Sequence, residues 1–186
     1  MKRLVFTLLF TVLGLVLGNA QTYTADAAKS ELSVSGTSSL HDWHCAVKSF
    51  SGTINATVEN GKVTKLSDFN FSFNVTSLDS GKGAMDKKMY EALKEENNPK
   101  VTYKGSEVIM NADGTAKFKG QMTMAGVTKY FETIVKLGYE GSTLELNGSK
   151  AFKLAEFKID PPTAMFGTIK TGEEVSIHYN ISLTTK

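Results

Sequence analysis

The chain has 186 residues, 41% of them hydrophobic, and a formal net charge of +2. This length suits one domain with a sizeable core, and the small net charge gives no electrostatic reason to expect nucleic acid or an anionic membrane as a partner. The single cysteine excludes a disulfide within the chain, so the core must supply the stability.

Residues 1–20 have the three parts of a secretory signal peptide, namely a start with Lys2 and Arg3, an apolar run and a Gly-Asn-Ala cleavage site. The apolar run is shorter than the roughly 20 residues that a membrane-spanning helix needs. We therefore expect cleavage after Ala20, which also removes two cations and leaves no formal net charge. The mature chain, residues 21–186, is expected to be one domain without an integral membrane span, in the periplasm or secreted.

The stretch "HDWHC", residues 41–45, concentrates unusual side chains. If it is a flat strand, alternation places His41, Trp43 and Cys45 on one face and His44 on the other. Trp43 would then pack into the interior or its mouth, with Cys45 as a small buried side chain. The alternative is a metal-binding or redox site that uses His41, His44 and Cys45 after a local bulge.

The segment "DFNFSFNVTS" alternates strictly between apolar and polar residues. Phe69, Phe71 and Phe73 fall on one side, and Asn70 and Ser72 on the other. A period of two over this length predicts a half-buried strand. The three phenylalanines are candidates for the lining of an interior.

One segment has helical spacing instead. Met85, Met89 and Leu93 recur every four residues in "GAMDKKMYEALKEENNPK", with Lys and Glu on the other face. This pattern predicts one amphipathic helix over about residues 84–96, stopped at Pro99. We expect the helix to cover one end of the sheet.

Alternation resumes after the helix. "KFKGQMTMAG" places Met122 and Met124 on the same side, and "EEVSIHYNISL" alternates over residues 175–183. Methionine is flexible and polarisable, as suits a surface that moulds to an apolar guest, but a filled core would show the same pattern. Asn60-Gly61 can form a two-residue hairpin turn. Short alternating strands joined by turns predict an all-β, antiparallel barrel of about eight strands.

Motifs of catalysis are missing along the whole sequence. There is no Gly-rich phosphate loop, nucleophile elbow or His-Glu-x-x-His pattern, and most of the acidic residues fall on the helix's polar face, in turns or outward along strands. We therefore expect no enzyme activity, no cofactor and no metal. A protein that binds an apolar molecule needs only shape and apolar walls.

Several segments, in this order and spacing, resemble the YceI-like family: "YTADAAKSELSVSG", "SFSGTI", "VTSLDSGKGAMDKKMYEALKEENNPKVTYKGSEV", "KGQMTMAGVTK" and "TGEEVSIHYNISL". The resemblance covers nearly the whole mature chain. It implies an exported bacterial protein with a lipocalin-like antiparallel barrel, in a family of which some members hold polyisoprenoid lipids inside.

The chain departs from the family near its C-terminus. Many members carry an Asn-Arg-x-Asp-Phe-Gly stretch where this sequence has "FKLAEFKI", residues 152–159. The loop "DPPTAMFGT" that follows sets Met165 and Phe166 between prolines and a glycine, which indicates an apolar flap at the barrel rim.

Together these features predict an exported protein that holds an isoprenoid-type molecule inside the barrel, as carrier, reservoir or sensor. The expected partner is therefore an apolar small molecule, a polyisoprenoid lipid, and the oligomeric state stays open, with a dimer as one option. A filled-core barrel that acts through its outer surface is a further alternative. The candidate ligand-binding residues are Trp43, Phe69, Phe71, Phe73, Met85, Met89, Met122, Met124, Phe152, Met165 and Phe166.

Overall fold

The structure, a computed structural model, describes residues 20–185. Residues 1–19, with most of the predicted signal peptide, lie outside this range. Among the described residues, no helix has the length and apolar character to cross a bilayer. The strands are β1 (Ala20–Ala25), β2 (Glu31–Ser38), β3 (Trp43–Val47), β4 (Ser51–Glu59), β5 (Lys62–Asn74), β6 (Leu78–Asp79), β7 (Lys100–Met110), β8 (Thr115–Met124), β9 (Val127–Glu140), β10 (Thr143–Lys153), β11 (Thr163–Ala164) and β12 (Ile169–Thr185).

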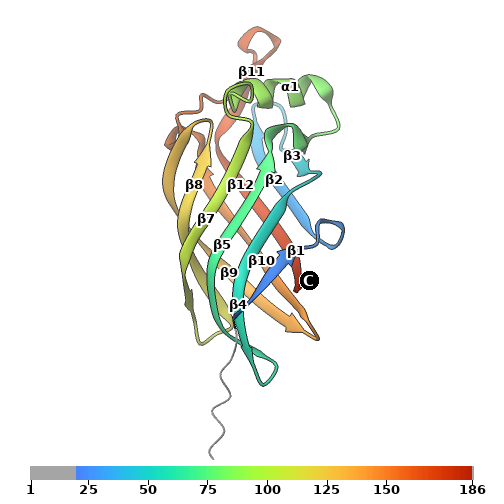
Figure 1. Cartoon of the computed structure of the whole chain (residues 1–186). Coiled ribbons are helices and arrows are strands. Elements are labelled where there is room, and N and C mark those ends of the chain that lie inside the picture. Colours follow the sequence, from blue (N-terminus) through green and yellow to red (C-terminus); the bar gives the residue numbers. More distant parts are fainter. Residues whose placement is uncertain (1–19, 186) are drawn as a thin grey trace, which may run out of the picture.

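Eight strands close into an antiparallel barrel, in the order β1, β4, β5, β7, β8, β9, β10 and β12 (Figure 1). The circuit closes where Tyr23 of β1 lies opposite Thr185 of β12. Strands β2, β3 and β6 extend the sheet from the same edge of β12 that β1 pairs with, farther along the strand, where β2 pairs with residues 171–180. The predicted all-β, lipocalin-like barrel of about eight strands is thus confirmed.

The helix α1 (Gly83–Ala92) lies across one end of the barrel (Figure 1). The predicted helix over residues 84–96 was too long, because the chain turns after Leu93. Lys94 adopts a left-handed φ of 54°, its N–H bonds to the carbonyl of Glu91, and the N–H of Glu95 bonds to the carbonyl of Tyr90 at 3.0 Å. These two bonds form a Schellman motif, which ends the helix.

The short 3-10 helices are η1 (Ala27–Lys29), η2 (Val75–Ser77), η3 (Leu154–Phe157) and η4 (Met165–Gly167). Of these, η3 closes part of the barrel wall. Phe157 is fully buried, and its ring packs edge-on against Phe152, which packs in the same way against Phe131 of β9. The wall therefore continues through aromatic packing where strand pairing stops.

Pairing between β9 and β10 is confined to the hairpin side. It runs from Glu140 opposite Thr143 to Lys136 opposite Asn147, although both strands continue well beyond. The side chain of Tyr179 on β12 reaches this opening, and its hydroxyl donates to the carbonyl of Ile134 at 3.2 Å. Tyr179 and η3 together fill the seam between the two strands.

The interior has two unlike halves. Away from α1, a cluster of fully buried side chains, including Ile54, Leu144 and Leu183, fills the barrel. Near α1, a second buried cluster that includes Val101, Met122 and Phe152 forms the walls of an open space instead. Alternation along the strands places apolar side chains inward in both halves.

Two glycines on neighbouring strands make room for the ring of Phe69. A Cβ atom on Gly105 or on Gly120 would lie 2.8 Å from the Phe69 Cζ atom, and one on Gly120 would also lie 2.5 Å from the carbonyl oxygen of Lys104. Phe69 is 2% exposed and packs on Tyr103 and Phe118, with ring centroids 4.9 and 5.1 Å apart. The two glycines thus leave room for the large ring of Phe69, which belongs to the buried cluster of the filled half.

Candidate ligand cavity

A cavity of about 450 Å³ lies beneath α1. This volume falls within the range of roughly 300–1,000 Å³ that is usual for small-molecule sites. Its walls come from α1, from eight strands (β2, β3, β5, β6, β7, β8, β10 and β12) and from the segment between β10 and β12. The apolar lining residues are Val34, Leu40, Trp43, Phe73, Leu78, Ala84, Met85, Met89, Ala92, Leu93, Val101, Met122, Met124, Phe152, Leu154, Ile159, Pro162, Met165, Ile169, Val175 and Ile177.

Hydrogen bonds to β6 and its flanking residues hold α1 over the cavity. The Asp86 carboxylate accepts from the backbone N–H of Ser80 at 2.8 Å and from the Ser80 hydroxyl at 2.6 Å. The Tyr90 hydroxyl donates to the carbonyl of Leu78 at 2.7 Å. Because the polar side of the helix makes these contacts, Met85 and Met89 are left to face the cavity.

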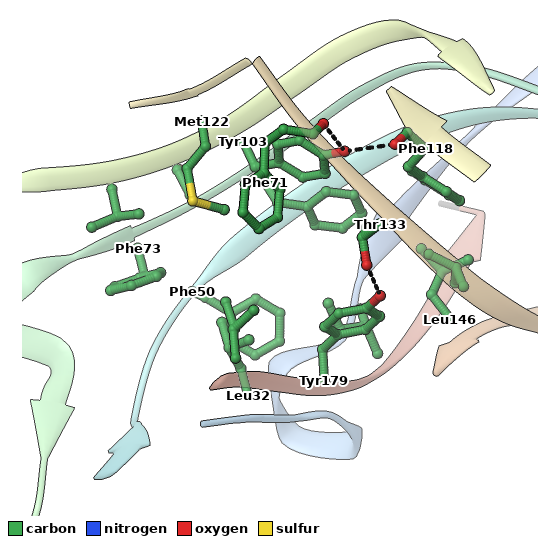
Figure 2. A pocket seen from close by; sticks show the side chains of 16 residues that line it. Leu32, Phe50, Phe71, Phe73, Tyr103, Phe118, Met122, Thr133, Leu146 and Tyr179 are labelled. Atoms are coloured by element: carbon green, nitrogen blue, oxygen red, sulfur yellow. Dashed lines mark hydrogen bonds between the residues drawn. The ribbon is translucent and has the colours of Figure 1, made fainter. Parts of the chain in front are cut away.

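A second cavity of about 90 Å³ lies deeper in the barrel (Figure 2). It shares Phe73, Val101, Met122 and Ile177 with the larger cavity, so the same side chains separate the two spaces. An apolar chain that displaced these side chains would pass from one space into the other. The remaining lining residues are Leu32, Phe50, Phe71, Ser72, Tyr103, Phe118, Phe131, Thr133, Val135, Leu146, Tyr179 and Ile181.

The hydroxyl groups around the deeper cavity are all used within the protein. Tyr103 donates to the carbonyls of Phe118 and Phe131, each at 3.1 Å, and Thr133 and Tyr179 share a bond of 2.7 Å (Figure 2). Burial raises the pKa of the Tyr103 and Tyr179 hydroxyls, so both stay protonated. The space therefore offers a guest dispersion contacts rather than hydrogen bonds.

The mouth of the larger cavity carries the charges. Lys82, just before α1, and Lys88, within it, contribute to the lining together with His41, whereas no carboxylate does so among the described residues. Lys88 forms an ion pair with Glu91 at 2.8 Å, and both side chains are about half exposed. The mouth is therefore weakly basic and the interior apolar.

The structure brings most of the predicted site residues together. Phe71 contributes to the deeper cavity, and Phe73 and Met122 contribute to both. The larger cavity also includes Trp43, Met85, Met89, Met124, Phe152 and Met165.

Two predicted residues lie outside both linings. Phe69 points inward as its alternation predicts, but its ring occupies the space above Gly105 and Gly120 and belongs to the packed core. Phe166 projects into solvent with 111% relative exposure.

The sequence analysis missed several lining residues. Val101 and Tyr103 alternate within "KVTYKG", so the period-two signal was present for them. Phe50 lies between β3 and β4, outside any periodic segment, and no sequence signal marks it. Ile159 follows η3 and likewise lacks a periodic pattern.

The candidate metal ligands of the stretch 41–45 do not converge. Cys45 is fully buried, His44 is exposed on the opposite side of β3, and His41 precedes the strand with its Nδ1 atom 2.6 Å from the carbonyl oxygen of Asp42. Within residues 20–185, no group of three or more His, Cys, Asp or Glu side chains could hold a metal ion. The geometry gives no support to the metal or redox alternative.

Burial raises the pKa of the Cys45 thiol to about 11, with the charge of Asp86 as the next contribution. Trp43, two residues earlier, lies with its ring over Gly36, where a Cβ atom would lie 2.5 Å from the ring, and donates from Nε1 to the carbonyl of Thr37 at 3.0 Å. The unusual residues of this stretch therefore serve packing and the cavity wall.

A family model described as the YceI-like domain matches residues 23–183. Among curated proteins, none matches the chain. The comparison with solved structures finds several chains of the same fold.

The crystal structure of BcnA from Burkholderia cenocepacia has a TM-score of 0.72 at 18% identity, covering 85% of this chain and 98% of that one. A polyisoprenoid binding domain from Saccharophagus degradans, implicated in plant cell wall breakdown, has a TM-score of 0.64 at 11% identity, covering 89% and 99%. The YCEI protein of Campylobacter jejuni has a TM-score of 0.62 at 14% identity, covering 76% and 84%. Identities this low show a shared fold.

Proposed function

The chain belongs to the YceI-like family, and from this membership we propose that it is an exported lipid-binding protein. It holds an isoprenoid-type apolar molecule inside the barrel and acts as its carrier, reservoir or sensor. The similar domain from Saccharophagus degradans, described as polyisoprenoid binding, supports this ligand class. The signal-peptide pattern of residues 1–20 supports export to the periplasm or beyond the cell.

The cavity of about 450 Å³ beneath α1 carries the proposal. A filled-core barrel that works only through its outer surface would have no reason to keep such a space, because an empty apolar cavity costs stability. Burial of each methylene group contributes about 0.8 kcal/mol, so a long hydrocarbon chain can bind tightly without a charged partner. The deeper space behind Phe73 and Met122 offers such a chain room to extend.

Binding rather than catalysis fits the polar groups of the interior. The hydroxyls of Tyr103, Thr133 and Tyr179 are bonded within the protein, and burial keeps both tyrosines protonated. A general acid or base needs a pKa near the working pH and access to the substrate. These groups are suited to hold the wall together.

The test is native mass spectrometry of the purified protein, followed by solvent extraction and mass spectrometry of the extract. We expect one adduct per chain, released as apolar molecules with masses spaced by isoprene units. A bare polypeptide mass and an extract without lipid, from protein purified without detergent, would contradict the proposal. An extracted apolar molecule without isoprene spacing would keep the lipid-binding function and replace the ligand class.

A further inference from the structure

Three exposed apolar side chains gather at the cavity end of the barrel. Leu40 is 66% exposed, Met165 70% and Phe166 fully, and we call these three residues the apolar tip. Met165 and Phe166 belong to the loop between β11 and β12, which projects beyond α1 (Figure 1). Leu40 lies in the loop between β2 and β3. The other large exposed hydrophobic residues within 20–185, Ile109, Tyr130 and Ile134, lie on the outer wall of β7 and β9.

Two hydrogen bonds join the β2–β3 loop to the start of β12, next to the second loop of the apolar tip. The N–H of Ser39 donates to the carbonyl of Lys170 at 2.9 Å, and the N–H of Lys170 donates to the Ser39 hydroxyl at 3.1 Å. Leu40 follows Ser39 directly, and Lys170 lies four residues after Phe166. The two loops that carry the apolar tip are therefore joined near their bases, at the mouth of the larger cavity.

The β11–β12 loop presents its large side chains to solvent through a backbone conformation that is energetically unfavourable for them. Met165, Phe166 and Gly167 have φ values of 50°, 54° and 88°, all in the left-handed region. Residues with a Cβ atom disfavour this region, and surface turns that need it usually carry Gly or Asn. Such strain in residues other than glycine is typical of functional positions. Here it presents a phenylalanine and a methionine to water.

The apolar tip continues into the larger cavity. Leu40 and Met165 also contribute to the cavity lining, so an apolar surface runs from the outside into the barrel. Lys82 and Lys88 flank this route at the mouth, and Lys88 is paired with Glu91. Apolar side chains beside cationic ones match the layered chemistry of a bilayer surface, where hydrocarbon lies beneath phosphate groups.

We propose that the apolar tip inserts into the interfacial layer of a lipid bilayer and brings the cavity mouth against it. An apolar ligand then passes between bilayer and barrel without crossing water. This inference rests on the proposed function, which supplies a ligand that dissolves in membranes. It is compatible with the absence of net charge on the mature chain, because apolar insertion provides most of the attraction and the two lysines a smaller part.

A bilayer fits the apolar tip better than a protein partner. A stable protein interface buries roughly 800 Å² on each side and involves about 20–30 residues. The apolar tip offers only three large side chains, two of them on the projecting β11–β12 loop, which is too small for such an interface. Insertion of a few apolar side chains into the interfacial layer requires no matching surface.

The experiment measures co-sedimentation of the mature chain, residues 21–186, with phosphatidylcholine vesicles. Removal of one large side chain from the inserted surface should weaken binding about tenfold. We expect this loss for Phe166→Ser and Met165→Ser, each as a single change. Ile109→Ser is the matched control, because Ile109 is 41% exposed on the outer wall, and it should bind within about twofold of the wild type. Addition of phosphatidylglycerol should strengthen binding in a salt-dependent way, through Lys82 and Lys88.

The docking inference is overturned if the wild type stays in the supernatant, or if Ile109→Ser loses binding as much as Phe166→Ser does. It is also overturned if the apolar tip instead joins two copies, so that native mass spectrometry shows a dimer that Phe166→Ser dissociates. Extraction of lipid from the wild type, measured alongside vesicle binding, shows whether the docking inference or the proposed function has failed. Extracted lipid without vesicle binding refutes docking alone, whereas vesicle binding without extracted lipid refutes the proposed function alone.

Discussion

The side-chain oxygens of Thr133 on β9 and Tyr179 on β12 lie 2.7 Å apart inside the barrel, although β10 separates their strands in the sheet. Gly148 of β10 makes this possible, because a Cβ atom there would lie 2.6 Å from the Tyr179 hydroxyl. Tyr179 also donates to the carbonyl of Ile134, beside the place where β9 and β10 cease to pair. The Tyr179 hydroxyl thus reaches across the seam between β9 and β10 and forms hydrogen bonds with two groups of β9.

Replacement of Tyr179 by phenylalanine should lower the free energy of unfolding by about 1–2 kcal/mol, because it leaves the buried Thr133 hydroxyl and the Ile134 carbonyl short of a partner. Urea unfolding followed by Trp43 fluorescence measures the change. Tyr130→Phe is the control, since the Tyr130 hydroxyl bonds to Glu132 on the exposed outer wall at 2.6 Å. That variant should stay within about 0.5 kcal/mol of the wild type. Equal losses in both variants would show that the seam bond has no special role.

Gly120→Ala should destabilise the barrel by about 1–3 kcal/mol, because the new Cβ meets a strand carbonyl, that of Lys104, and the tip of the Phe69 ring. Thermal unfolding by circular dichroism measures the effect. Gly83→Ala serves as the control, since no neighbouring atom lies within 4 Å of its added Cβ and alanine favours the helix α1. It should be neutral or slightly stabilising. An unchanged melting temperature for Gly120→Ala would mean that β7 and β8 move apart easily near Gly120.

The Cys45 thiol should be almost inert in the folded protein. Its pKa, raised to about 11 by burial, leaves on the order of 0.1% thiolate at pH 8, and the sulfur has no exposed surface. A disulfide reagent such as Ellman's should therefore react slowly at pH 8 in buffer and rapidly in denaturing urea. Reaction in buffer at the rate of a free thiol would contradict this and would revive a redox role for Cys45.

The barrel could be predicted because its signals are local. The alternation around Phe71 and the turn at Asn60-Gly61 can each be recognised within ten residues of sequence. Neither signal depends on contacts with strands that are distant in the sequence. The end of α1 could not be predicted in the same way. A left-handed residue ends the helix at Lys94, where glycine or asparagine would be the usual signal.

The cavity is a property of strands that are distant in sequence. Alternation predicts that Phe69 and Phe71 point inward, but it says nothing about the space that each side chain meets. Phe69 meets Gly105 and Gly120 and becomes core, whereas Phe71, two residues later, faces the deeper cavity. Phe50 enters from a segment without periodicity. Alternation can therefore name the inward face of a strand without showing which of its side chains line a cavity.

A substitution that fills the larger cavity should separate ligand binding from stability. Val34 is half-buried in β2 and lines the cavity, so Val34→Trp places the added rings in empty space and should change the free energy of unfolding by less than about 1.5 kcal/mol. The displaced guest loses the burial of at least two methylene groups, about 1.6 kcal/mol, so the lipid extracted per chain should fall about tenfold at limiting ligand. Val58→Trp is the opposite control, because Val58 packs against the filled half and lines neither cavity. That variant should lose stability by overpacking and keep its lipid, and equal lipid content in the two folded variants would place the ligand elsewhere.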